Sequence, residues 1–142
     1  MTKDLPPTMV NPYVYGSIYH NYGIGLDQLK QYASAVEAYD ETMSIERILI
    51  NNNPARYNLY IALTRMNMGV SPDELGKYDD AIAAFKEALE ICSTMSVQDP
   101  PQYDELMAKT FLCYGITLRK SNQFSEAATV EKLVISLCRN LA

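Results

Sequence analysis

The 142-residue sequence is poor in the residues on which most enzymes and metal sites depend. It has a single histidine, His20, and three cysteines without any CxxC pair. A Ser–His–Asp or Cys–His centre would have to use that one histidine, and a zinc site would need more ligands at closer spacing. The sequence also contains no glycine-rich phosphate loop. We therefore expect a protein that is not an enzyme and that binds neither a cofactor nor a metal.

Basic residues are few and scattered as well. Twelve Lys and Arg against seventeen Asp and Glu leave a net charge of −5, whereas binding to nucleic acid depends on clustered cations. No apolar run is long enough to cross a bilayer, and residues 1–12 lack the apolar core of a signal peptide. These features argue against nucleic acid and membranes as partners. They predict a cytoplasmic protein in which Cys92, Cys113 and Cys138 are reduced and buried.

A period of 46 residues organises the rest of the chain. Gly23, Gly69 and Gly115 are separated by this interval. The same shift relates two further sets of residues, which are Tyr32, Tyr78 and Phe124, and Ala35, Ala81 and Ala127. Several classes of residue that share one offset indicate a true internal repeat, and periods of this length are typical of helical arrays.

Each unit of the period contains two apolar helical patterns joined by a turn. The second helix is clearest in the middle unit, where apolar residues recur at spacings of three and four: Ala81, Ile82, Phe85, Ala88, Leu89 and Cys92. The first helices are expected over Tyr13 to about Leu29, Ala55 to about Val70 and Gln102 to about Lys120. Pro72 predicts that the middle one ends early or kinks, which leaves a longer turn from Ser71 to Gly76.

The repeated glycines suggest a close approach between the two helices of each unit. A glycine inside a helix costs about 1 kcal/mol relative to alanine unless packing requires the missing side chain. We expect each glycine to lie against the alanine that follows it by twelve residues, in the second helix of the same unit. The aromatic residue near the turn would fill the remaining gap.

The middle unit resembles a tetratricopeptide repeat through Gly69, Gly76, Tyr78, Ala81, Phe85 and Ala88. The first unit shares Tyr19, Gly23, Tyr32, Ala35 and Tyr39 with this pattern. The third keeps Phe111, Gly115, Phe124 and Ala127 but has Glu131 where an aromatic residue is expected. The usual repeat has about 34 residues, so these units resemble the longer-helix variety found in kinesin light chains.

The resemblance implies an all-α fold, an α-α superhelix of three tetratricopeptide-like helix-turn-helix repeats with six helices in antiparallel pairs. We expect an irregular lead-in at residues 1–12 and a repeat domain at 13–142. The repeats would cover about 13–53, 54–99 and 100–142.

The resemblance also implies a function, that of a scaffold or adaptor module that binds a protein or peptide in a concave groove lined by the first helices. The groove residues would be Ser17, His20, Asn21, Ile24, Leu63, Met66, Asn67, Val70, Lys109, Leu112 and Ile116. The family's polar clamp for a C-terminal carboxylate is missing, because Ile24, Met66 and Val70 occupy its places. An apolar peptide or helix is the expected ligand, and coverage of these residues by a neighbouring helix is the alternative.

The last helical pattern is apolar on more than one side, which suggests a second kind of interaction. Val130, Leu133, Leu137 and Leu141 would form an oligomer face, most simply that of a homodimer. A fragment of a longer repeat array or of a larger signalling protein would explain the same pattern. In the first helix, Tyr15, Tyr19 and Tyr22 share a face, which indicates core packing or else an aromatic contact surface.

Overall fold

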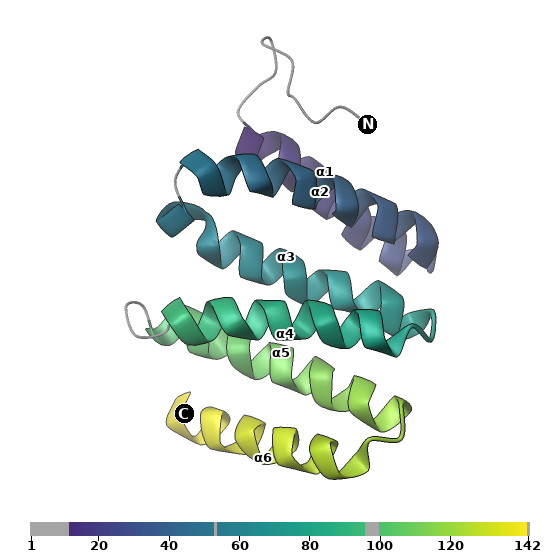
Figure 1. Cartoon of the computed structure of the whole chain (residues 1–142), viewed down its shortest axis with the longest axis vertical. Helices are drawn as coiled ribbons and strands as arrows, with labels where there is room; N and C mark the ends of the chain where they lie inside the picture. Colours follow the sequence, from purple (N-terminus) through teal and green to yellow (C-terminus); the bar gives the residue numbers. More distant parts are fainter. Residues whose placement is uncertain (1–11, 53, 96–99, 142) are drawn as a thin grey trace. The chain divides into compact units, whose positions relative to one another are not determined.

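The computed structural model describes residues 12–52, 54–95 and 100–141, and within these ranges the chain forms six α-helices and no strand. Side chains are described for residues 14–48, 58–95 and 102–139. The helices are α1 (Pro12–Gln28), α2 (Tyr32–Asn52), α3 (Pro54–Glu74), α4 (Tyr78–Met95), α5 (Pro100–Lys120) and α6 (Phe124–Leu141). The predicted all-α class with antiparallel helix pairs is confirmed (Figure 1).

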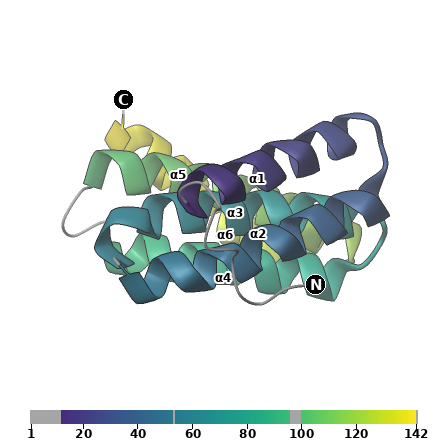
Figure 2. The same ribbon diagram turned by 90° about the horizontal axis from the view of Figure 1, so that it is seen from above.

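The chain divides into two compact units, Met1–Asn58 and Leu59–Ala142. Unit 1 contains the hairpin of α1 and α2, whose connecting turn is visible in Figure 2. Unit 2 contains most of α3 together with α4, α5 and α6, and in it α4 packs on α5 and α5 packs on α6. We refer to the helix pairs α1–α2, α3–α4 and α5–α6 as repeats 1, 2 and 3. The predicted lead-in lies outside the described residues except for Pro12, and the predicted repeat boundaries stay a prediction.

The three first helices begin at prolines and end in the same hydrogen-bonded turn. Proline suits the first helical position because no intrahelical donor is lost there. The residues with positive φ are Lys30, Gly76 and Asn122, which are again 46 residues apart. In each turn the amide of the residue after the positive-φ position donates to the carbonyl five residues before it, at 2.8 Å in all three cases. This hydrogen bond defines a Schellman motif. The repeat therefore extends to the backbone conformation of the inner turns.

The end of α3 corrects one expectation. The helix does not stop before Pro72 but continues through it to Glu74. Proline removes one hydrogen bond near the end of the helix, and contacts from α5 hold this last turn in place. The Asp73 carboxylate accepts a hydrogen bond from Thr117 Oγ1 at 2.6 Å and another from Lys120 Nζ at 2.5 Å.

Two apolar clusters form the core of unit 2. The first joins α4, α5 and α6 through the buried residues Ala81, Phe85, Tyr114, Leu118, Ala127 and Val130. The second joins α3, α4 and α5 through Ala62, Cys92, Tyr103 and Leu106. Met66 packs against both clusters, so α3 shares in both parts of the core.

Two of the three repeated glycines have an aromatic ring as their nearest neighbour, where alanine was the expected contact. A Cβ added to Gly23 would lie 2.6 Å from Tyr39 Cε1, and one added to Gly69 would lie 2.6 Å from Phe85 Cζ. These rings follow their glycines by sixteen residues, not twelve. In these two repeats the missing side chain thus makes room for a ring of the second helix close to the backbone of the first.

Candidate functional site

The predicted groove residues of α1 differ in exposure. Ser17 and Ile24 are half-buried, and Asn21 is exposed. His20, expected to line the groove, is only 4% exposed. Its ring packs edge-on against Tyr39 with the centroids 5.9 Å apart, and burial lowers the pKa of the imidazole. His20 is therefore a core residue of unit 1, which corrects its assignment to an open groove.

The predicted groove residues of unit 2 include three exposed apolar side chains. Leu63 on α3 is 39% exposed, while Leu112 and Ile116 on α5 are 52% and 47% exposed. Lys109 is exposed and forms an ion pair with Glu105, one turn earlier on the same helix. The remaining members, which are Met66, Asn67 and Val70, are half-buried.

A cavity of about 170 Å³ brings two of these residues together. Val70 of α3 and Ile116 of α5 line it together with Phe85 and Cys113, and these four residues give it an apolar wall. The rest of the lining is a polar wall that consists of Asp73, Glu74, Thr117 and Lys120. An opening of this size and composition fits one apolar side chain of a ligand, with charged groups beside it.

The polar wall is built around the Asp73 carboxylate. This residue is 8% exposed and accepts the hydrogen bonds from Thr117 and Lys120 described above. The ammonium group of Lys120 also lies 3.8 Å from Glu74 Oε1. The hydrogen bond to Asp73 raises the pKa of Lys120, so the lysine stays charged at neutral pH. Sequence reasoning missed this arrangement, because isolated polar residues 44 and 47 positions apart carry no periodic signal.

Cys113 lies in the same cavity but is a poor nucleophile. Burial, and then the negative charge of Asp73, raise the pKa of its thiol. Burial likewise raises the pKa of Cys92 to about 11. Since the thiolate is the reactive form, both cysteines stay protonated and unreactive. Cys138 is exposed, which corrects the expectation that all three thiols are buried.

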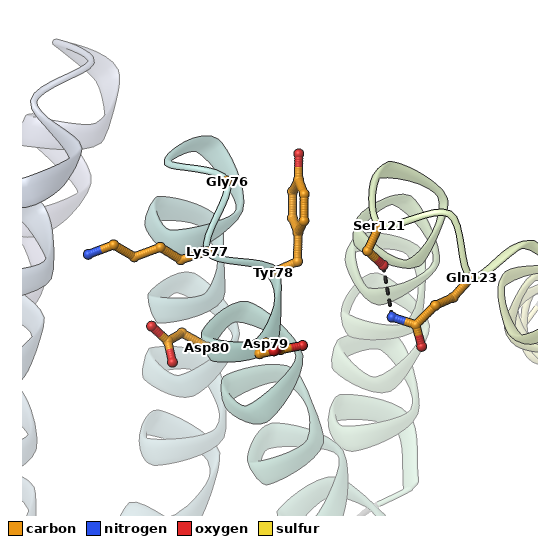
Figure 3. Close-up of a pocket in the computed structure, with 7 residues that line it drawn as sticks. All are labelled: Gly76, Lys77, Tyr78, Asp79, Asp80, Ser121 and Gln123. Atoms are coloured by element: carbon orange, nitrogen blue, oxygen red, sulfur yellow. Dashed lines mark hydrogen bonds between the residues drawn. The ribbon is translucent and has the colours of Figure 1, made fainter.

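A second depression, of about 470 Å³, lies between the inner turns of repeats 2 and 3 (Figure 3). Gly76, Tyr78 and Asp79 line one side of it, and Ser121 and Gln123 line the other. The amide of Gln123 donates to Ser121 Oγ at 2.9 Å. The charged residues that line it are all exposed (Lys77, Asp79 and Asp80), so water solvates them and weakens any electrostatic contact with a ligand.

The predicted oligomer face of α6 is only partly available. Val130 is 5% exposed and belongs to the core, which corrects its assignment to an outer surface. Leu133 is 45% exposed and Leu137 is half-buried, whereas the side chain of Leu141 lies outside those described. Ile135, which lies on another side of α6, is 52% exposed.

The described residues contain neither a membrane-spanning helix nor a cluster of metal ligands. None of the helices in this part of the chain has the length and apolar character needed to span a bilayer. Nor does this part of the chain bring together three or more His, Cys, Asp or Glu side chains that could hold a metal ion.

Comparison with known proteins identifies the middle of the chain. Residues 60–94 match the family model described as tetratricopeptide repeat, and this segment includes most of α3 and nearly all of α4. A search of curated proteins finds no match. The matched repeat type suggests a protein–protein interaction module. Gly69 lies under the ring of Phe85 inside this matched segment, which is similar to a tetratricopeptide repeat.

Proposed function

We propose that the chain is a non-enzymatic adaptor whose unit 2 binds an apolar peptide or helix along α3 and α5. The exposed apolar side chains of α3 and α5 carry this proposal. Leu63 on α3 and Leu112 and Ile116 on α5 are exposed large apolar side chains, and an apolar ligand would cover them. The groove residues of α1 belong to unit 1, and the proposal for unit 2 does not depend on them.

The cavity supplies specificity in this proposal. One apolar side chain of the ligand enters between Val70 and Ile116, and the carboxylates of Asp73 and Glu74 lie beside it. With Lys120 included, the polar wall carries one net negative charge. A ligand with a Lys or Arg next to its apolar anchor is therefore favoured over one with an acidic neighbour.

Selection of peptides from a random display library on the full chain tests the proposal. We expect the selected peptides to share an apolar anchor and to lose binding to a Leu112→Glu, Ile116→Glu double variant. Both side chains are about half exposed, so the variant should keep its circular dichroism spectrum. Met66 is unsuitable for this test because it packs against both core clusters.

Leu133→Glu is the matched control, since this exposed leucine lies on α6, outside the groove. It should leave peptide binding unchanged. Equal binding of the selected peptides to the wild type and to the groove variant would refute the proposal, as would the failure of any peptide to be selected.

Self-association through the α6 face of Leu133 and Leu137 is the second candidate function, and the exposure of Leu133 favours it. Sedimentation of the wild type should then show a dimer that a Leu133→Glu, Leu137→Glu variant loses. A wild type that stays monomeric at high concentration would contradict it. The cytoplasmic location and the origin from a larger signalling protein stay predictions.

A further inference from the structure

The 46-residue period allows burial to be compared at equivalent positions, and α4 and α6 differ sharply in this respect. In α4, Leu89 packs against the first core cluster and Cys92 is fully buried beside Tyr103 and Leu106 of α5. The equivalent positions of α6 are Ile135, which is 52% exposed, and Cys138, which is exposed. Among the described residues no helix follows α6. The side of α6 that corresponds to the α5-covered side of α4 is therefore uncovered.

Burial differs between α4 and α6 only on the side that carries Ile135 and Cys138. Leu133 is equivalent to Glu87 of α4, whose side chain remains 57% exposed although α5 is packed on that helix. Leu133 is thus on a side that faces water in both repeats. Ile135 and Cys138, three residues apart, lie together on the other side.

The first helix shows the complementary difference. In α5, Leu106, Thr110 and Tyr114 are 7%, 0% and 5% exposed. The equivalent residues of α1, which are Val14, Ile18 and Tyr22, are 46%, 58% and 59% exposed. Each of these helices packs against its own second helix, α6 or α2. The difference is therefore due to repeat 2, which precedes α5, whereas no described helix precedes α1.

Val14, Ile18 and Tyr22 follow one another at intervals of four and so form one stripe along α1. The stripe is separate from the predicted groove residues of that helix. It is also more apolar than its buried counterpart in α5, because Ile18 stands where α5 has Thr110. The rings of Tyr15 and Tyr19 are in edge contact, with their centroids 5.2 Å apart. Tyr22, which belongs to the stripe, is exposed.

We propose that the chain associates head-to-tail with a second copy of itself. The side of α6 that carries Ile135 and Cys138 packs against the α1 stripe of the next copy, as α4 packs against α5 within one chain. The α4–α5 interface supports a second copy of the chain as the partner. The α6 face is equivalent to the α4 half of that interface, and the α1 stripe is equivalent to its α5 half. The contact joins two different surfaces, so each bound copy offers a free surface to a further copy, and association does not stop at a symmetric dimer. It is independent of the groove proposed above.

Two single variants test the pairing. Ile18→Glu should block the α1 stripe and Ile135→Glu should block the α6 face, so each variant alone should be monomeric. An equimolar mixture should form a species of twice the monomer mass and nothing larger, since each variant keeps the surface that the other has lost. Light scattering after size-exclusion chromatography measures these masses, and the wild type should grow in mean mass as its concentration rises.

Two further variants serve as controls. Leu133→Glu places on α6 the residue that α4 carries at the equivalent position, and Leu29→Glu alters a 67% exposed leucine in the turn beyond α1. Both should associate like the wild type, and all four variants should keep the helical circular dichroism spectrum. Association that survives in Ile18→Glu would indicate a symmetric α6 contact and overturn the proposal. Association that survives in Ile135→Glu, a monomeric mixture, or a wild type that is monomeric throughout would overturn it as well.

Discussion

Repeats 2 and 3 fill the same place in the helix hairpin with different side chains. In repeat 2 the ring of Phe85 lies directly over Gly69, so that an added Cβ would overlap with the ring. In repeat 3 the residue equivalent to Phe85 is Glu131, and a Cβ on Gly115 would meet only Glu131 Cγ and Val130 Cγ1, both at 3.6 Å. The glycine is thus a packing requirement in repeat 2 and is dispensable in repeat 3.

The difference extends to the position twelve residues before the ring. In repeat 3, Arg119 donates to Glu131 through two hydrogen bonds of 2.6 and 2.8 Å. In repeat 1 the same pair of positions holds Asp27 and Tyr39, and the phenol donates to the carboxylate at 2.9 Å. Phe85 has no hydroxyl group to donate. Asp73 of repeat 2 bonds instead to Thr117 and Lys120 of α5, where it links two repeats and forms the polar wall of the cavity.

The largest expected effect follows from the overlap at Gly69. Gly69→Ala should lower the free energy of unfolding of unit 2 by about 1–3 kcal/mol, because the added methyl group forces Phe85 or the backbone to move. Urea denaturation followed by circular dichroism measures this loss. A second substitution, Phe85→Leu, should recover part of it by removing the ring. An unchanged midpoint for Gly69→Ala would show that the ring moves aside at little cost.

The next largest loss of stability is expected when the hydrogen bonds of Asp73 to α5, which link repeats 2 and 3, are weakened. Asp73→Asn keeps an acceptor for Thr117 but removes the charge that faces Lys120, and we expect a loss of about 1–2 kcal/mol because Asp73 is buried while Lys120 is partly hydrated. Urea denaturation serves here too. Asp27→Asn in unit 1 is the matched control at the equivalent position. Equal losses in both variants would remove the distinction between the repeats.

Acid should lower the stability of unit 1 through the imidazole ring of His20, which packs against Tyr39. Since burial lowers the pKa of His20 in the folded state, the unfolded chain binds a proton first as the pH falls below about 6.5. Stability is then lost as the pH decreases through this window, by at most about 1.4 kcal/mol per pH unit for a single proton. Thermal unfolding between pH 7.5 and about 5 measures the slope. His20→Gln, which does not titrate, should flatten it, and an identical slope would exclude His20 as the cause.

The period predicted which positions correspond, but not which side chains touch. Helix ends were close to their predicted places except at Pro72, where contacts from α5 to Asp73 outweigh a purely local signal. The sequence does not distinguish alanine from the aromatic residue as the partner of glycine, because residues twelve and sixteen positions later lie on one face of the second helix. Val130 was placed outside for a related reason, since α6 is apolar on several sides and the sequence does not identify the side packed on α5.

A smaller effect of opposite sign is expected at Gly115. Gly115→Ala should raise the stability of unit 2 by up to about 1 kcal/mol, because alanine favours the helix and its methyl group meets ordinary van der Waals contacts. Thermal and urea unfolding beside Gly69→Ala give a direct test, as both substitutions are chemically identical and lie at equivalent positions of neighbouring repeats. A destabilised Gly115→Ala would show that repeat 3 packs as tightly as repeat 2.

The smallest effect is expected at the ion pair that replaces the ring. Glu131→Gln keeps the carbon chain that lies near Gly115 and removes only the charge that faces Arg119. Hydrogen bonds to Arg119 lower the pKa of Glu131, but both groups are exposed, and water and salt screen such pairs strongly. The unfolding midpoint should therefore stay within experimental error of the wild type at neutral pH, in low and in high salt. A marked loss confined to low salt would mean that the charge contributes to holding α5 and α6 together, and that repeat 3 has replaced an aromatic contact with an electrostatic one of comparable strength.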